Sequence, residues 1–117
     1  MIQLDLAPED LHLTRFAYSP LVELSTGYRM LKDTDVQHHF PRWMAVASEA
    51  FSDLEFPYLE GLIPRCGYIP DFLTPTPTRT DLTIEHELQK LMNTPTSVIQ
   101  DGILKMIDLV GDSEIRQ

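Results

Sequence analysis

The sequence has little of several features that whole classes of protein require. Cys66 is its only cysteine, which excludes a disulfide within the chain and a zinc site built from cysteines. No apolar run approaches the roughly 20 residues that a membrane-spanning helix needs. The opening residues, MIQLDLAPED, lack the basic and apolar parts of a signal peptide. We therefore expect a cytoplasmic protein without membrane contact.

Clustered basic residues are also missing. The chain has 18 acidic and 9 basic residues, which gives a formal net charge of −9. Binding to nucleic acid depends on groups of lysine and arginine that neutralise phosphates, so we do not expect this chain to bind DNA by itself. With 117 residues, 43% of them apolar, it has the length and composition of one folded domain, residues 1–117.

The spacing of apolar residues predicts a mainly α-helical fold with a minor β component. Ile2, Leu4 and Leu6 alternate with polar residues, which is typical of a half-buried strand. Residues 13–18 form a second extended segment that could pair with it. The strand edge that remains free would then invite pairing with a second copy of the chain.

Helices are expected wherever a capping residue or a proline opens an apolar repeat. A polar loop is expected at residues 33–37. Gly27 lies inside a predicted helix, where the missing side chain would let a second helix cross closely. The start signals predict one or two turns after Ala7 and helices from Ser19-Pro20 to Lys32, from Pro41, from Pro57 to Leu62, from Asp81 or Thr83, and from Thr94-Pro95 to a stop at Gly111.

The segment of residues 65–78, RCGYIPDFLTPTPT, lies between two predicted helices. Pro70, Pro75 and Pro77 prevent a regular hydrogen-bonded ladder. Its large apolar side chains nevertheless favour burial. We expect an ordered, proline-rich loop that lies across the domain with its aromatic side chains directed inward. Such a loop would shape a groove or contact a partner.

This loop and the segment RFAYSPLVEL, residues 15–24, resemble the N-terminal region of ArsR-type winged-helix transcriptional regulators of Gram-positive bacteria. The resemblance extends in order over nearly the whole chain and includes the opening MIQLDLAPEDL. In that group the DNA-binding winged helix lies further downstream, and neither motif is catalytic. The resemblance therefore implies a regulatory N-terminal domain that senses an effector, dimerises or contacts the downstream domain, and that meets DNA only through that domain.

Motifs for catalysis or metal binding do not stand out. His38 and His39 are adjacent, so their side chains leave a helix in different directions, and no HxxxH or HExxH spacing occurs. Metal-sensing relatives of the ArsR type usually carry paired cysteines, a pattern that the lone Cys66 does not reproduce. Glu85 and Glu87 are most simply interpreted as solvated. We expect no enzymatic activity, no cofactor and no metal site.

The aromatic side chains leave two interpretations open. They either fill the core or line a cavity for an apolar effector, in which a few polar groups fix the orientation of the ligand. The candidate contacts for a ligand or partner are Arg15, Tyr18, Arg29, Trp43, Arg65, Tyr68, Asp71 and Phe72.

The last predicted helix carries an apolar stripe at helical spacing. Together with the strand edge it predicts a homodimer, because large exposed apolar patches on monomers are rare and two-fold pairing is the commonest way to cover them. The stripe consists of Ile99, Ile103, Met106 and Val110.

The alternative to a regulator is a freestanding protein-interaction or small-ligand module without a link to DNA.

Overall fold

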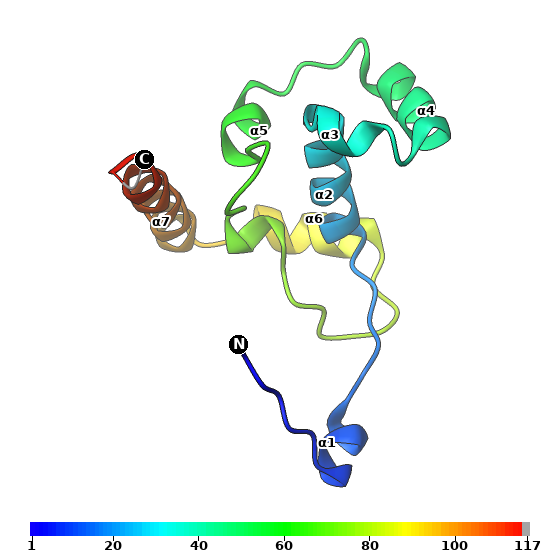
Figure 1. Cartoon of the computed structure of the whole chain (residues 1–117), viewed down its shortest axis with the longest axis vertical. Coiled ribbons are helices and arrows are strands. Elements are labelled where there is room, and N and C mark those ends of the chain that lie inside the picture. Colours follow the sequence, from blue (N-terminus) through cyan, green and yellow to red (C-terminus); the bar gives the residue numbers. More distant parts are fainter. Residues whose placement is uncertain (116–117) are drawn as a thin grey trace.

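The computed structural model describes the backbone of residues 1–115 and the side-chain surroundings of residues 1–111, and it is mainly α-helical, as predicted. Figure 1 shows α2 near the centre, α6 crossing below it, and α1 and α7 at the extremities. The elements are α1 (Pro8–Leu13), α2 (Pro20–Lys32), α3 (Thr34–Gln37), α4 (Pro41–Phe51), α5 (Pro57–Leu62), the 3-10 turn η1 (Asp71–Leu73), α6 (Ile84–Met92) and α7 (Thr96–Ile115).

The predicted helix starts are confirmed where local capping chemistry sets them. The Ser19 hydroxyl accepts a hydrogen bond from the Val22 backbone N–H at 3.2 Å, and proline occupies the first turn of α2, α4 and α5. Proline suits this position because its missing N–H would have no partner within the helix. Of the two caps proposed for α6, Thr83 is the one used, since its hydroxyl accepts from the His86 N–H at 3.3 Å.

Three local expectations were wrong. Within residues 1–115 no strand forms, and Ile2–Leu6 is an exposed irregular segment, because a strand without a paired neighbour has no ladder to stabilise it. Residues 33–37 are not a loop: the Asp33 carboxylate accepts from the Asp35 N–H at 3.0 Å and caps the one-turn helix α3. Helix α7 continues through Gly111 to Ile115, since one glycine costs only about 1 kcal/mol in a helix.

Helix α2 packs against α3, α4, α6 and η1 and so organises the body of the molecule. It meets α4 at Gly27, where an added Cβ would lie 3.2 Å from the Trp43 ring. That distance is shorter than an ordinary van der Waals contact. The close approach expected at Gly27 is therefore confirmed, and Trp43 is the side chain that makes it.

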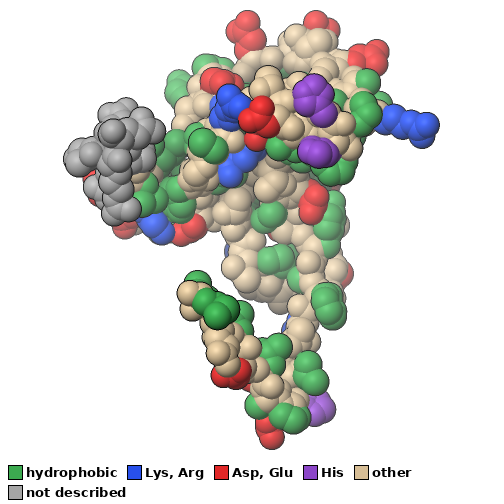
Figure 2. Space-filling model, in the orientation of Figure 1, with side chains coloured by type: hydrophobic (Ala, Val, Ile, Leu, Met, Phe, Trp, Pro, Cys, Tyr) green, Lys and Arg blue, Asp and Glu red, His purple; other side chains and the backbone are tan. Residues whose placement is uncertain are grey.

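The buried core is small and belongs largely to the loop that follows α5. Ile63, Ile69 and Leu73 form its main cluster, and Leu21 of α2 is 4% exposed. The Cα radius of gyration is 17.0 Å, whereas a compact domain of this length has about 13 Å. The difference reflects an open shape, in which the N-terminal segment around α1 stands away from the body (Figure 1 and Figure 2).

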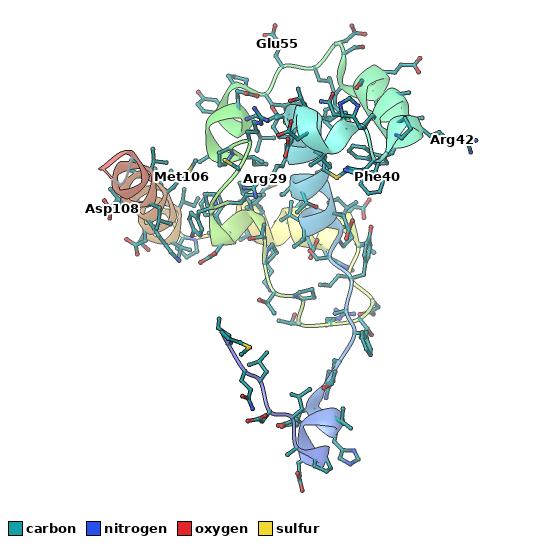
Figure 3. The ribbon with its side chains drawn as sticks, viewed as in Figure 1. Arg29, Phe40, Arg42, Glu55, Met106 and Asp108 are labelled. Atoms are coloured by element: carbon teal, nitrogen blue, oxygen red, sulfur yellow. The ribbon has the colours of Figure 1, made fainter. Side chains whose placement is uncertain are left out.

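Three side chains of α2 hold the backbone of this loop. Ser25, Arg29 and Lys32 follow one another at spacings of four and three, which places them on one face of the helix. Figure 3 shows Arg29 directed into the centre of the body. The accepting carbonyls are Leu73 (3.0 Å) for Ser25, Pro64 (3.0 Å) and Gly67 (2.7 Å) for Arg29, and Glu60 (2.9 Å) and Ile63 (2.7 Å) for Lys32.

A buried carboxylate joins α6 to the start of α2. Glu87 is only 3% exposed, and its two oxygens accept from the Ser19 hydroxyl and the Leu21 backbone N–H, each at 2.6 Å. The first N–H groups of a helix have no partner within it, and the helix dipole favours a negative charge at that end. Glu87 therefore satisfies and stabilises the N-terminus of α2. The expectation that it is solvated was wrong.

Replacing Glu87 with alanine should lower the melting midpoint strongly. The change leaves the Ser19 hydroxyl and the Leu21 N–H buried without their acceptor, at a cost of about 1–3 kcal/mol for each. Thermal unfolding followed by circular dichroism measures the effect. The matched control is Glu85→Ala, which alters an exposed side chain two residues away on the same helix. Equal midpoints for the two variants would contradict this role of Glu87.

Candidate functional site

A groove beside Phe72 collects three of the residues that the sequence proposed as contacts. It consists of two adjoining hollows of about 280 and 220 Å³, both lined by Asp71, Phe72 and Val98, and Tyr68 lines the smaller one. The walls come from η1, α6 and α7. We call this feature the Phe72 groove. It is the concave surface where the proline-rich loop meets the last two helices.

Phe72 fixes how α7 lies against the loop. An added Cβ on Gly102 would lie 3.1 Å from the Phe72 ring and 3.6 Å from Pro70. A Cβ at position 102 would require the Phe72 ring to move by a few tenths of an ångström, so glycine favours this close contact. Phe72 is half-buried, whereas Ile69, Pro70 and Leu73 are the deeply buried residues of the loop. The loop thus buries apolar side chains as expected, but its aromatic rings, Tyr68 and Phe72, are only half-buried, and its aliphatic residues lie deepest.

The smaller hollow has a charged rim. The Lys105 Nζ lies 3.8 Å from an Asp71 carboxylate oxygen and 4.7 Å from the centre of the Tyr68 ring, over its face. The Tyr68 hydroxyl accepts from the Asp71 backbone N–H at 3.3 Å. Both charged side chains are more than half exposed, so this ion pair contributes little to stability. It mainly orients Lys105 across the edge of the groove.

The larger hollow is lined mainly by apolar side chains, although the buried Glu87 also lines it. Leu21, Leu82 and Leu91 supply apolar surface, and Lys90 and His86 stand at the edge. The His86 ring nitrogen Nδ1 lies 3.1 Å from the Thr83 hydroxyl. Such a combination can hold an apolar group and contact a polar or charged group beside it.

The other proposed contact residues do not join this groove. Arg29 is engaged with loop carbonyls, and Arg65 forms an ion pair with Asp35 at 3.1 Å and lies 3.7 Å from Asp33. Arg29 therefore holds the loop, whereas the Arg65–Asp35 pair has both side chains more than half exposed and contributes little to stability. Arg15 lines a separate hollow formed with residues 77–81.

The two remaining aromatic candidates also lie elsewhere. Tyr18 is 58% exposed at the base of the N-terminal segment, and Trp43 packs on Gly27 while it remains 41% exposed. The eight proposed contacts therefore divide into three that share the Phe72 groove and five that are dispersed. The dispersed residues do not define a common ligand site.

Sequence reasoning missed Glu87, Lys90 and Lys105 as neighbours of the groove. A signal for Glu87 was present, because it shares a helical face with Ile84, Leu88 and Leu91 through spacings of three, one and three. A carboxylate on that face is expected to meet a donor when the helix packs. The two lysines carry no comparable sequence signal.

Metal-binding side chains do not gather in the part of the chain that the structure describes: no group of three or more histidine, cysteine, aspartate or glutamate side chains is placed to hold an ion. His38, His39 and Cys66 are exposed. None of the described helices combines the length and apolarity needed to cross a membrane.

Comparisons with known proteins add no assignment to this geometry. No family model matches the chain, and neither the curated proteins nor the solved structures contain a match. The functional interpretation therefore depends on the residues themselves and on the arrangement described above.

Truncation of Phe72 should lower stability and loosen α7. Full burial of a phenylalanine is worth about 1.5–3 kcal/mol, and this half-buried ring should contribute somewhat less. Phe72→Ala is expected to lower the melting midpoint and to increase amide hydrogen exchange in α7 more than in α2. The control is Phe16→Ala, which removes a ring that is 93% exposed. Unchanged exchange in α7 would show that Phe72 does not hold this helix.

Proposed function

We propose that this chain is the regulatory N-terminal domain of an ArsR-type winged-helix transcriptional regulator and that it acts through contacts with other protein surfaces. The proposal is supported by RFAYSPLVEL and the proline-rich loop, the two segments that carry the resemblance. DNA would be bound by a winged-helix domain further downstream. A cytoplasmic location and a homodimeric state belong to the same proposal.

The observation that carries the proposal is the apolar surface left on α7. Leu104 is 58% exposed and Ile107 is 60% exposed, while Lys105 and Gly102 face η1. Of the stripe expected to form an interface, Ile99, Ile103 and Met106 are half-buried, and Val110 is 49% exposed. Apolar residues thus occupy both the half-buried and the exposed sides of α7, and large exposed apolar patches usually mark interfaces.

The N-terminal segment offers a second apolar surface. Leu4 and Leu13 are 83% and 78% exposed, and Phe16 is 93% exposed. The side-chain hydrogen bonds described for residues 1–14 link Gln3 to Asp5, Ala7 to Asp10 and Thr14 to Asp10, so all of them lie within that segment. A segment with this composition gains most free energy when another protein surface covers it. It supports a domain whose function is association.

The regulatory part of the proposal is supported by how α7 is attached. Among the described elements, α7 makes its main packing contacts with η1, a single turn of the loop. A ligand or partner in the Phe72 groove would touch both sides of this attachment. Such binding could change the orientation of α7 and of whatever follows it, because small shifts at a packed contact are transmitted to attached elements.

A freestanding small-ligand module is the second candidate. The observation that favours it is a hollow lined by aromatic and aliphatic side chains near the centre of the body. The two candidates differ in whether the gene encodes a basic helix-turn-helix segment after residue 117. That observation would discriminate between them directly.

Association should be detectable in solution. Sedimentation equilibrium over a wide concentration range is expected to give a dimer mass for the native chain. Ile107→Glu should dissociate the dimer, because a charge cannot be buried in an apolar interface without a large cost. Circular dichroism should show that helical content is retained.

The matched control for this test is Gln100→Glu, which adds the same charge at an exposed polar position of α7. It should leave the dimer intact. A monomer mass for the native chain at every concentration would contradict the association proposal. Equal dissociation by both variants would assign the effect to net charge and not to the α7 surface.

The chain itself should not bind duplex DNA at physiological salt. Its formal net charge of −9 repels the phosphate backbone. Fluorescence anisotropy with a labelled duplex tests this expectation, and micromolar binding would contradict it. A downstream winged-helix domain joined to the same chain should restore binding that weakens as salt concentration rises.

A further inference from the structure

Another hollow, which we call the aromatic pocket, is lined by side chains from α2, α4, α5, η1 and α6. It has a volume of about 200 Å³ and shares Leu21 and Leu91 with the Phe72 groove. The rings of Tyr28, Phe51 and Phe56 form one wall. Their centres are 5.8 to 6.2 Å apart, and each pair is tilted or edge-on, which is the favoured geometry for aromatic contacts.

The base and mouth of the aromatic pocket are aliphatic. Ile63 and Leu73, at the base, are 2% and 5% exposed. Leu24 and Leu88, which also line the pocket, are 47% and 40% exposed and so stand where solvent enters. The pocket is therefore an accessible concave surface whose deep part is shielded from water.

Every polar side chain of the aromatic pocket already has a partner. The Ser25 hydroxyl donates to the Leu73 carbonyl at 3.0 Å, and the Tyr28 hydroxyl donates to a Glu60 carboxylate oxygen at 2.8 Å. Burial and the hydrogen bond to Glu60 raise the pKa of Tyr28, which keeps this hydroxyl protonated as a donor. No lining residue carries a charge. A ligand with a charge or a strong hydrogen-bonding group would lose its hydration without compensation.

Size narrows the ligand class further. A cavity of about 150 Å³ lined by leucine, isoleucine and phenylalanine is large enough to bind benzene. The aromatic pocket is somewhat larger and has the same kind of lining. It can therefore hold one aromatic ring with a short alkyl substituent.

From this geometry we infer that the aromatic pocket binds a small uncharged aromatic or alkyl-aromatic molecule, or the corresponding group of a larger ligand. The inference names the effector class for the proposed regulator and depends on that proposal for the role of effector only. Binding itself follows from the shape and chemistry of the pocket. It does not require a dimer or DNA.

The position of Leu73 connects this pocket to α7. Leu73 lines the aromatic pocket, and its neighbour Phe72 contacts Gly102 of α7. Both residues belong to the single turn η1, whose last carbonyl is held by Ser25. A ligand that displaces Leu73 would move this turn and shift the Phe72 contact with α7.

Toluene is a suitable probe, with benzoate as the charged comparison. In the intact chain with labelled leucine methyl groups, toluene should shift the Leu24, Leu59 and Leu73 signals in a saturable manner. Benzoate at the same concentrations should leave them unchanged. Leu59→Phe places a larger side chain in the pocket, which takes up space that toluene needs. It should weaken toluene binding by about 10-fold to 100-fold, because overpacking is costly.

A second variant and a control keep the test decisive. Leu88→Phe narrows the mouth at a partly exposed position and should also weaken binding, even if Leu59→Phe fails to fold. Val46→Phe, which enlarges a side chain of α4 that is 69% exposed and lies outside the pocket, should bind toluene as the native chain does.

Three results would overturn the inference. They are the absence of saturable toluene shifts in the native chain, unchanged binding in both pocket variants, and methyl shifts that follow protein concentration and not toluene, which would mean that a second copy fills the pocket. None of these readouts depends on association through α7. Failure of the ligand inference is therefore distinguishable from failure of the proposed regulatory domain.

Discussion

The contact between the Glu87 carboxylate and the start of α2 is the interaction on which the rest of the body depends. Its two hydrogen bonds join residues 68 and 66 positions apart, and both are buried. Water does not compete for a buried acceptor, so the N-terminus of α2 has one strongly favoured position on α6. Once α2 is fixed there, its polar face is directed at the loop after α5, and the loop acquires its shape.

The loop owes that shape more to backbone acceptors than to secondary structure. Three α2 side chains donate to five carbonyls between residues 60 and 73. Prolines remove N–H donors from this segment but leave its carbonyls available. Donors on a neighbouring helix can therefore satisfy these carbonyls. Hydrogen bonds from Lys32 and Tyr28 also hold the pKa of Glu60 below its usual value, which keeps this carboxylate ionised beside the loop. The same arrangement creates the Phe72 groove on one side of η1 and a wall of the aromatic pocket on the other.

The small size of the buried core connects this architecture to the proposed function. The core is concentrated around residues 63–73, so α7 and the N-terminal segment keep much of their apolar surface in solvent. A domain built in this way gains stability when other surfaces cover it. The acidic net charge favours protein or uncharged ligands over nucleic acid as direct partners. These are the features that support the proposed regulatory association domain.

The sequence by itself determined the helical class and most helix starts, because a cap such as Ser19 or Thr83 acts on N–H groups only three residues away. It also predicted that the proline-rich loop buries apolar side chains. Only the tertiary structure decided that Glu87 is buried, that Arg29 serves the loop, and that Tyr68, Asp71 and Phe72 share one groove with Lys105. The tertiary structure also decided that the strand expected at residues 2–6 does not form. Each of these outcomes depends on a partner far away in the chain, and local spacing contains no information about where that partner lies.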